Sequence, residues 1–323
     1  MTGRWKFSWL VLVTGLWQSF TVASFGQAAP PPPPARAEIE AVLAQATHRA
    51  NQVATPGASA AQTLHVVLLA DKKDHGPEQH DYPRWQERWA LLLGGKAVSG
   101  ASQVNLFGPP ISDERASAGA AHVAVMCAQG WPTESQLAQA DVIVVFCYVA
   151  WNDLHKQQLK HYLDHGGGLV LIHAATWTMP GPDPQVATLV GVGGFLHYRH
   201  GPVQLRITDS EHPVCRGLPR TLAFFDETYW PPTPPLGTES ITVLAVSEDD
   251  NGAGPAARAP QPIFWTYQRG PGRVFGCVLG HYTWTFDDPW FRLLLLRGIA
   301  WAGGQPADRL DALALRGARV AGK

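Results

Sequence analysis

Gly166-Gly167-Gly168-Leu169-Val170-Leu171-Ile172-His173-Ala174-Ala175-Thr176-Trp177 is the stretch of the chain that decides the fold. The glycines predict a turn, the apolar run Leu169–Ile172 predicts a buried strand, and the small residues after His173 predict a sharp exit from that strand. In α/β folds that carry out acyl or amide transfer, such a strand-to-helix elbow presents a Ser or Cys nucleophile. His173 stands at the exit here, so the chain has the elbow without the usual nucleophile.

Further apolar strands alternate with helical segments around this stretch. Leu64–Ala70 and Asp141–Tyr148 are predicted as buried strands, while Tyr82–Leu93 and Asn152–His165 have helical spacing. Continuous apolar strands that alternate with helices are typical of a parallel sheet covered on both faces. The sequence therefore predicts a three-layer α/β/α fold with a mostly parallel central sheet. Further strands are expected at Val203–Thr208, Ile241–Val246, Pro262–Tyr267 and Arg273–Leu279, before a last helix at Pro289–Trp301.

The N-terminal residues 1–28 are predicted to be a signal peptide. Arg4 and Lys6 precede the apolar run Phe7–Val13, and Gly26-Gln27-Ala28 resembles a small-residue cleavage site. Ser, Thr and Gln dilute the run, which favours a cleaved signal over a permanent anchor. We therefore expect an exported protein, periplasmic or extracellular, without a stable transmembrane anchor.

The rest of the chain divides into three parts. Residues 29–62 are expected to form a Pro-rich spacer with an amphipathic helix at Glu38–Val53, residues 63–304 the main domain, and residues 305–323 a C-terminal tail. The oligomeric state is left open, a homo-oligomer included.

The composition excludes some functions and suits others. The net charge of −1 lacks the basic excess that a nucleic-acid-binding surface needs. Thirteen Trp and thirteen His suit a saccharide site, where rings stack on sugar faces, although core packing of most Trp is the alternative. The four cysteines show no CxxC spacing, and three lie in apolar runs, which favours free buried thiols over bridges.

Two groups of polar residues follow predicted strands. The loop after Leu64–Ala70 carries His75, His80 and Asp81, and ligands of open α/β sheets bind outside the carboxyl ends of the strands. These side chains are expected to contact substrate, with a solvated polar loop as the alternative. His173, at the carboxyl end of the predicted strand Leu169–His173, is expected to act as a base, to orient a hydroxyl or to bind a metal. The alternative is a core histidine with its hydrogen bonds satisfied.

Two later segments complete the candidate site. Glu227, beside Asp226 among aromatic residues, is the expected acid, with a pKa raised by burial; the alternative is a strand edge that bonds to the backbone. His281 follows another predicted strand, and the alternative there is an aromatic turn capped by an Asp. Trp177 and Trp284 are expected to stack on the sugar.

These side chains are expected to converge on one cleft. No cofactor is required by the sequence, and no HExxH motif is present, but such a cluster could hold a divalent metal. The residues that would hold it are His75, His80, His173 and His281.

The same segments carry a family resemblance. From about Leu64 to Gly304 the chain resembles the ThuA-like (trehalose utilisation) family, within the class I glutamine amidotransferase-like superfamily. The matching pieces are Asp74-His75-Gly76-Pro77 with His80-Asp81-Tyr82, Gly167-Gly168-Leu169-Val170 with His173-Ala174-Ala175, His212-Pro213 with Gly217-Leu218-Pro219, Asp226-Glu227 with Tyr229, and Gly280-His281 with Phe286-Asp287-Asp288-Pro289.

The resemblance implies a flavodoxin-like fold and a link to disaccharide or keto-sugar metabolism. The superfamily's amidotransferases use a Cys at the elbow, and none lies near Ile172 to Thr176, so glutamine amidotransferase activity is not expected. The leading hypothesis is a carbohydrate-active hydrolase, lyase or isomerase that works by acid–base chemistry, with His173 or His281 as base and Glu227 as acid. The alternative is a non-catalytic sugar-binding module on an amidotransferase-like scaffold.

Overall fold

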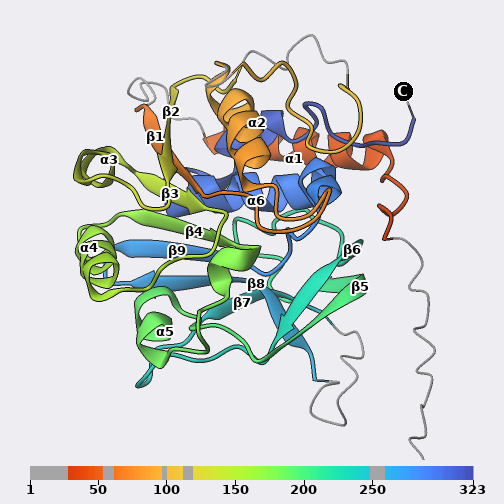
Figure 1. Ribbon diagram of the computed structural model, residues 1–323. Coiled ribbons are helices and arrows are strands. Elements are labelled where there is room, and N and C mark those ends of the chain that lie inside the picture. The colour runs from red at the N-terminus through yellow and green to blue at the C-terminus, as the bar shows by residue number, and fades with distance from the viewer. Residues whose placement is uncertain (1–27, 54–61, 97–99, 112–118, 248–258, 323) are drawn as a thin grey trace, which may run out of the picture.

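The computed structural model of the 323-residue chain describes residues 28–53, 62–96, 100–111, 119–247 and 259–322. Within these residues, one sheet lies at the centre and helices pack around it (Figure 1). The strands are β1 (Leu64–Ala70), β2 (Val123–Gln129), β3 (Val142–Val145), β4 (Gly168–Ile172), β5 (His197–Ile207), β6 (Thr221–Trp230), β7 (Thr242–Ser247), β8 (Gln261–Arg269) and β9 (Gly272–Cys277). The helices are α1 (Arg36–Val53), α2 (Tyr82–Gly94), α3 (Glu134–Gln139), α4 (Asp153–Asp164), α5 (Pro184–Val190) and α6 (Pro289–Ala302), with 3-10 turns η1 (His173–Thr176), η3 (Thr283–Asp287) and η4 (Ala307–Leu313).

The expectation of a mostly parallel sheet is wrong. The strand order is β2-β1-β3-β4-β9-β8-β7-β5-β6. Neighbours are parallel from β2 to β9 and antiparallel from β9 to β6. Apolar patterning shows how deeply a strand is buried but not its direction, and the short turn between β8 and β9 closes an antiparallel hairpin. The parallel part has the strand order of a doubly wound sheet.

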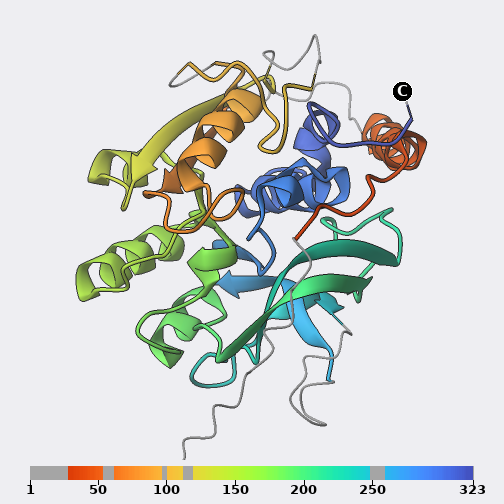
Figure 2. The ribbon, with the colours of Figure 1, turned by 45° about the vertical axis from the view of Figure 1, so that its right-hand side comes forward.

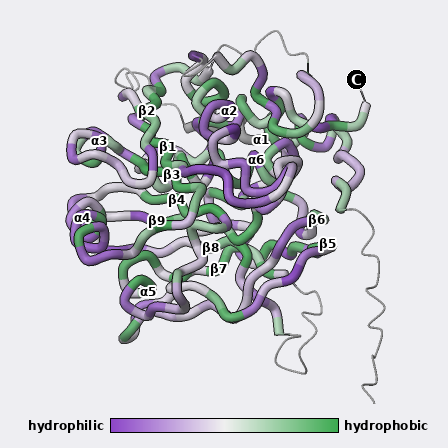
Figure 3. The backbone as a smooth tube through the Cα atoms, viewed as in Figure 1, coloured by the Kyte–Doolittle hydropathy of each residue, from purple (hydrophilic) through white to green (hydrophobic). Residues whose placement is uncertain are grey.

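Helices cover both faces of the parallel part, as the alternating apolar strands predict. Gly168 and Arg273 are paired across β4 and β9, and both face α6: a Cβ on Gly168 would meet Ala302, and Arg273 donates to the Trp301 carbonyl. Gly272, one residue earlier, faces α4 instead. Figure 2 shows α6 and α4 on opposite sides of the sheet, and Figure 3 shows hydrophobic colour along the central strands and hydrophilic colour over much of α4.

Both ends of the described chain pack on the domain. Ile39 and Val42 of α1 are buried, and α1 contacts η4. Ala35 also forms a bridge with Ala321. The amphipathic helix is therefore packed against the C-terminal segment. Nearly all of the expected signal peptide lies outside the described residues, and among those described no helix is long and apolar enough to cross a membrane.

Gly276 tests how tightly the centre of the sheet is packed. A Cβ there would lie 2.1 Å from the ring of the fully buried Trp265. We expect Gly276→Ala to lower the free energy of unfolding by about 1–3 kcal/mol, because a well-packed core must shift to accept the methyl group. Urea denaturation measures the change.

Gly181→Ala is the matched control, because a Cβ at Gly181 would have no neighbour within 4 Å. An equal loss of stability in both variants would contradict the packing argument.

Candidate active site

Four segments of the chain meet at one end of the parallel strands. His80 lies in the loop after β1, His173 directly follows β4, and His281 lies in the turn after β9. Because β1, β4 and β9 are parallel members of one sheet, their carboxyl ends share an edge. Glu227 and Tyr229 come from β6, in the antiparallel half.

The buried carboxylate of Asp226 holds β6 against the turn after β9. It accepts hydrogen bonds from the backbone N–H groups of Gly280 (3.2 Å) and His281 (2.9 Å), and from the Thr285 hydroxyl. Burial raises the pKa of Asp226, while the contacts with His173 and these donors act in the opposite direction. This contact delivers the neighbouring Glu227 to the ends of the parallel strands.

The resulting cluster is compact and buried. His173 Nε2 lies 2.9 Å from His80 Nε2, 2.9 Å from the Tyr229 hydroxyl and 3.2 Å from Glu227 Oε2. His281 Nδ1 lies 3.0 Å from the same Glu227 oxygen. One ligand atom from each of the three histidines and Glu227 falls within 4.8 Å of all the others, so this cluster could hold a metal ion.

Neighbouring acceptors orient two of the imidazoles. His173 Nδ1 is 2.7 Å from the Val278 carbonyl oxygen, and His80 Nδ1 is 3.0 Å from Asp74 Oδ1. A carbonyl or a carboxylate only accepts, so each Nδ1 carries a proton, and in the neutral form of each ring Nε2 presents a lone pair to the cluster. Both residues also have left-handed backbones, with φ of 51° at His173 and 42° at His80. Such strain in non-glycine residues gathers at functional sites.

The expected pKa pattern of the acids is reversed. Burial alone would raise the pKa of Glu227, but the close contacts with His173 and His281 lower it well below its usual range. The burial-raised pKa expected at Glu227 belongs to Asp226 instead. Glu227 is therefore a carboxylate at neutral pH, suited to bind a cation or to accept hydrogen bonds, and not the proton donor we expected. Burial also raises the pKa of Tyr229 well above 10, so its hydroxyl remains a donor.

His281 is the least satisfied member of the cluster. Burial lowers the pKa of His281 to about 4, so the ring is neutral at pH 7. Its Nδ1 is close to Glu227 but misaligned for a hydrogen bond, and neither ring nitrogen has a hydrogen-bond partner.

A pocket of about 1070 Å³ opens onto this cluster. His80, Glu227, Tyr229 and His281 line its wall, and His75 lies at its exposed side. The structure thus brings the expected histidines and Glu227 together. The aromatic side chains that also line the pocket are Tyr148, Trp177, Tyr198, Phe225 and Tyr282.

Two expected substrate contacts lie elsewhere. Trp284 is stacked behind Tyr282, with ring centroids 4.2 Å apart, and is not among the residues that line the pocket. Asp81 caps α2 by accepting from the Arg84 N–H, and it also pairs with the Arg84 guanidinium. A tryptophan and an aspartate are suitable types for contact with a sugar. Here, however, Trp284 stacks on Tyr282, and Asp81 caps α2.

Sequence reasoning missed several residues at the site. Tyr148, Tyr198 and His200 were not expected there, and Asp74 and Tyr229 were named without a role of their own, as parts of the family motifs. His200 Nε2 lies 3.4 Å from Glu227 Oε1 because β5 pairs with β6. The sequence could have indicated Asp74, because it lies only six residues before His80. The positions of the other missed residues depend on long-range strand pairing, which the sequence does not show.

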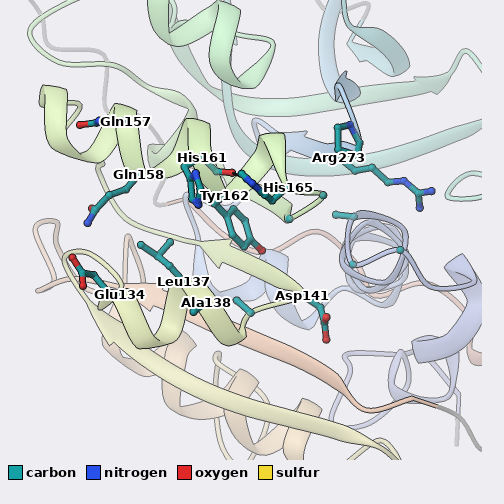
Figure 4. Close-up of a pocket in the computed structure, with 17 residues that line it drawn as sticks. Glu134, Leu137, Ala138, Asp141, Gln157, Gln158, His161, Tyr162, His165 and Arg273 are labelled. Carbon is teal, nitrogen blue, oxygen red and sulfur yellow. Dashed lines mark hydrogen bonds between the residues drawn. The ribbon is translucent and has the colours of Figure 1, made fainter.

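A second hollow, of about 910 Å³, lies near the opposite end of the parallel strands (Figure 4). His161, His165, Asp141 and Arg273 are among the residues around it. The two hollows have similar volumes, so volume does not choose between them. Among the described residues, the buried group of three histidines and a carboxylate belongs to the first pocket alone, and this makes it the candidate active site.

The thiols are unsuited to nucleophilic attack. All four cysteines are free, as the sequence predicts. Burial raises the pKa of Cys127 to about 11, and those of Cys147 and Cys215 to about 12. Burial raises the pKa of Cys277 well above 9. No thiol stands at the elbow after β4, where His173 lies.

The doubly wound parallel half of the sheet, with polar groups clustered at the carboxyl ends of its strands, defines an α/β protein with a site at the sheet edge. Comparison with known proteins gives the family. The ThuA family profile, described as trehalose utilisation, matches residues 108–302, more than half of the chain. The chain belongs to the ThuA family. His75 and His80 lie before the matched region, so the fold and not the profile connects them to the site.

Two solved structures share the fold. A ThuA-like protein from Bacteroides uniformis ATCC 8492 is 18% identical, with a TM-score of 0.55, over 79% of this chain and 99% of that one. A ThuA-like protein from Parabacteroides merdae ATCC 43184 is 21% identical, with a TM-score of 0.51, over 76% of this chain and 92% of that one. A search of curated proteins finds no significant match.

The raised thiol pKa values predict slow alkylation of the native protein. Because the thiolate is the reactive form, we expect iodoacetamide at pH 8 to label native cysteines at least about 100-fold more slowly than the urea-unfolded chain. Labelling should accelerate as the pH rises toward 10, with the half-buried Cys127 first. Mass spectrometry of the labelled peptides measures this, and rapid labelling of Cys147 at pH 7 would contradict it.

Proposed function

We propose that this ThuA family member acts on a disaccharide or a keto-sugar by acid–base chemistry at the pocket of His80, His173, Glu227 and His281. The observation that carries the proposal is the buried group of three imidazoles and one carboxylate, of which His80, Glu227 and His281 lie on the wall of an aromatic-lined pocket. Proton transfer needs positioned groups of suitable pKa and no nucleophile. The family's description as trehalose utilisation supports a carbohydrate substrate.

Glu227 and His281 are the proposed proton acceptors. The lowered pKa of Glu227 keeps it ionised, and His281 is neutral, with its unpartnered Nδ1 3.0 Å from Glu227 Oε2. Either group could take a proton from water or from a carbon beside a carbonyl. Tyr229, whose hydroxyl donates to Glu227 over 3.1 Å, is the proposed proton donor in place of Glu227. This division of roles suits a hydrolase, a lyase or an isomerase.

The aromatic lining supports a sugar as the ligand. Trp177 contacts Tyr229 and Tyr198 with ring centroids 4.9 Å and 6.1 Å apart, so one aromatic wall extends outward from the catalytic groups. Tyr198 is 58% exposed and Tyr148 is 36% exposed, and both line the pocket. Large exposed rings at a pocket can stack on the apolar face of a sugar while their polar tips remain hydrated.

The proposed compartment is outside the cytoplasm, periplasmic or extracellular. The basis is the sequence of residues 1–28, whose charged start, apolar run and small-residue end are those of a cleaved signal peptide.

Turnover tests the proposal. The protein is incubated with trehalose, sucrose and their 3-keto derivatives, and products are followed by mass spectrometry. We expect turnover of at least one of these, and a loss of kcat of about 10²- to 10⁴-fold in Glu227→Gln, which keeps the side-chain volume but removes the base.

His161→Asn, at the second hollow, is the matched control and should keep wild-type turnover. Sugar binding without any turnover would overturn the catalytic proposal and favour the sugar-binding module. Unchanged kcat in Glu227→Gln would overturn the role of this residue.

A further inference from the structure

We infer that His80, His173, Glu227 and His281 form a binding site for one divalent transition-metal ion. The inference deepens the proposed function, because the ion would lie in the same pocket, but its evidence and its test involve no turnover. Imidazole nitrogen together with a carboxylate oxygen is a donor set that Zn²⁺ and neighbouring first-row ions prefer.

The hydrogen bonds around the cluster leave two buried nitrogen lone pairs that a cation could bind. In the neutral form that binds metal ions, His80 and His173 each carry a lone pair on Nε2, because Nδ1–H of His173 donates to Val278 and Nδ1–H of His80 donates to Asp74 and to the Tyr82 hydroxyl, whose own proton goes to Asp74. The two lone pairs face one another across 2.9 Å, in side chains that are buried. An ion bound to both nitrogens removes this repulsion.

Tyr229 does not remove the deficit. Its single hydroxyl proton can serve either Glu227 Oε2 or His173 Nε2, and it reaches neither His80 nor His281 by any contact that would satisfy their nitrogens. Both ring nitrogens of His281, which is 3% exposed, have no hydrogen-bond partner. Buried polar atoms of this kind are rare and are explained by a missing ion or water. One of these two atoms, Nδ1, lies 3.0 Å from Glu227 Oε2.

The spacing of the donor atoms agrees with coordination to one ion. Neighbouring donors at about 2.0–2.1 Å from a tetrahedral zinc ion are about 3.3 Å apart. The measured separations are 2.9 Å for His80–His173, 3.2 Å for His173–Glu227 and 3.0 Å for Glu227–His281. Small outward movements of the side chains would bring them to the coordination distance.

The surrounding contacts are those that metal-bound histidines usually have. Asp74 accepts from His80, and the Val278 carbonyl accepts from His173, which fixes the tautomer and the ring orientation of each. Tyr82 also donates to Asp74 over 3.1 Å. Because His80, Glu227 and His281 line the pocket, an ion held there would face it, and a sugar oxygen could bind if the coordination expands from four to five ligands.

His75 is not a member of this set, although the sequence placed it among the candidate ligands. Its Nδ1 is 2.7 Å from Asp74 Oδ1, in a more exposed group of Asp74, His75 and His80. Glu227 takes its place, and brings a negative charge that three neutral imidazoles lack.

Metal binding to the purified chain tests the inference directly. The protein is stripped with chelator, dialysed, and titrated with Zn²⁺ by calorimetry and with Co²⁺ by visible absorption. We expect one ion per chain, Co²⁺ ligand-field bands, and a higher unfolding temperature with the ion bound.

Variants locate the ion. Glu227→Gln should weaken Zn²⁺ binding at least about 100-fold, and Asp74→Asn, which acts only through His80, about 10- to 100-fold. His161→Asn, at the second hollow, is the control and should bind as the wild type does. Circular dichroism of each variant shows that it folds.

The absence of Zn²⁺ heat and of Co²⁺ bands in the wild-type chain would overturn the inference, as would equal losses in Glu227→Gln and His161→Asn. A wild-type chain that binds neither Zn²⁺ nor Co²⁺ but turns over a sugar would overturn the metal site and leave the proposed function standing. Tight binding of one ion without turnover would do the reverse.

Discussion

The contact between Asp226 and the turn after β9 is the interaction on which the site depends. β6 is at the far edge of the sheet in pairing order, four strands from β9. The backbone N–H groups of Gly280 and His281 both donate to Asp226, and the Trp284 indole donates to the Phe225 carbonyl beside it. Burying a carboxylate is costly unless donors surround it, and these donors supply that compensation. Glu227 and Tyr229 reach the cluster because β6 is held there.

A second constraint is that buried imidazoles need partners. The backbone carbonyl of Val278 serves His173 and the side chain of Asp74 serves His80, so the orientation of each ring is set outside the cluster. Both residues have left-handed backbones, at a cost of order 1–3 kcal/mol each. The strained backbone thus lies at two members of the cluster, His80 and His173. A preorganised set of lone pairs and one carboxylate is the result, and it can move a proton or hold a cation.

Local patterning predicted much of this molecule. The bounds predicted for the first strand, Leu64–Ala70, agree with β1, and the elbow at His173 lies directly after β4, because burial on both faces selects a continuous apolar run. His80, His173 and His281 were found because they follow strands. The antiparallel half was mistaken because apolar runs do not record direction. The raised pKa was expected at Glu227 and is found at Asp226, because a pKa depends on neighbours that are distant in sequence.

The sequence by itself determined the alternation of strands and helices, the missing thiol at the elbow, the family motifs and most members of the site. These follow from periodicity and residue type, which are properties of short segments. Only the tertiary structure decided that β6 reaches the ends of the parallel strands, that Glu227 stands where His75 was expected, and that Trp284 lies behind Tyr282. Those outcomes depend on strand pairing and on hydrogen bonds between segments more than fifty residues apart, which no local pattern contains.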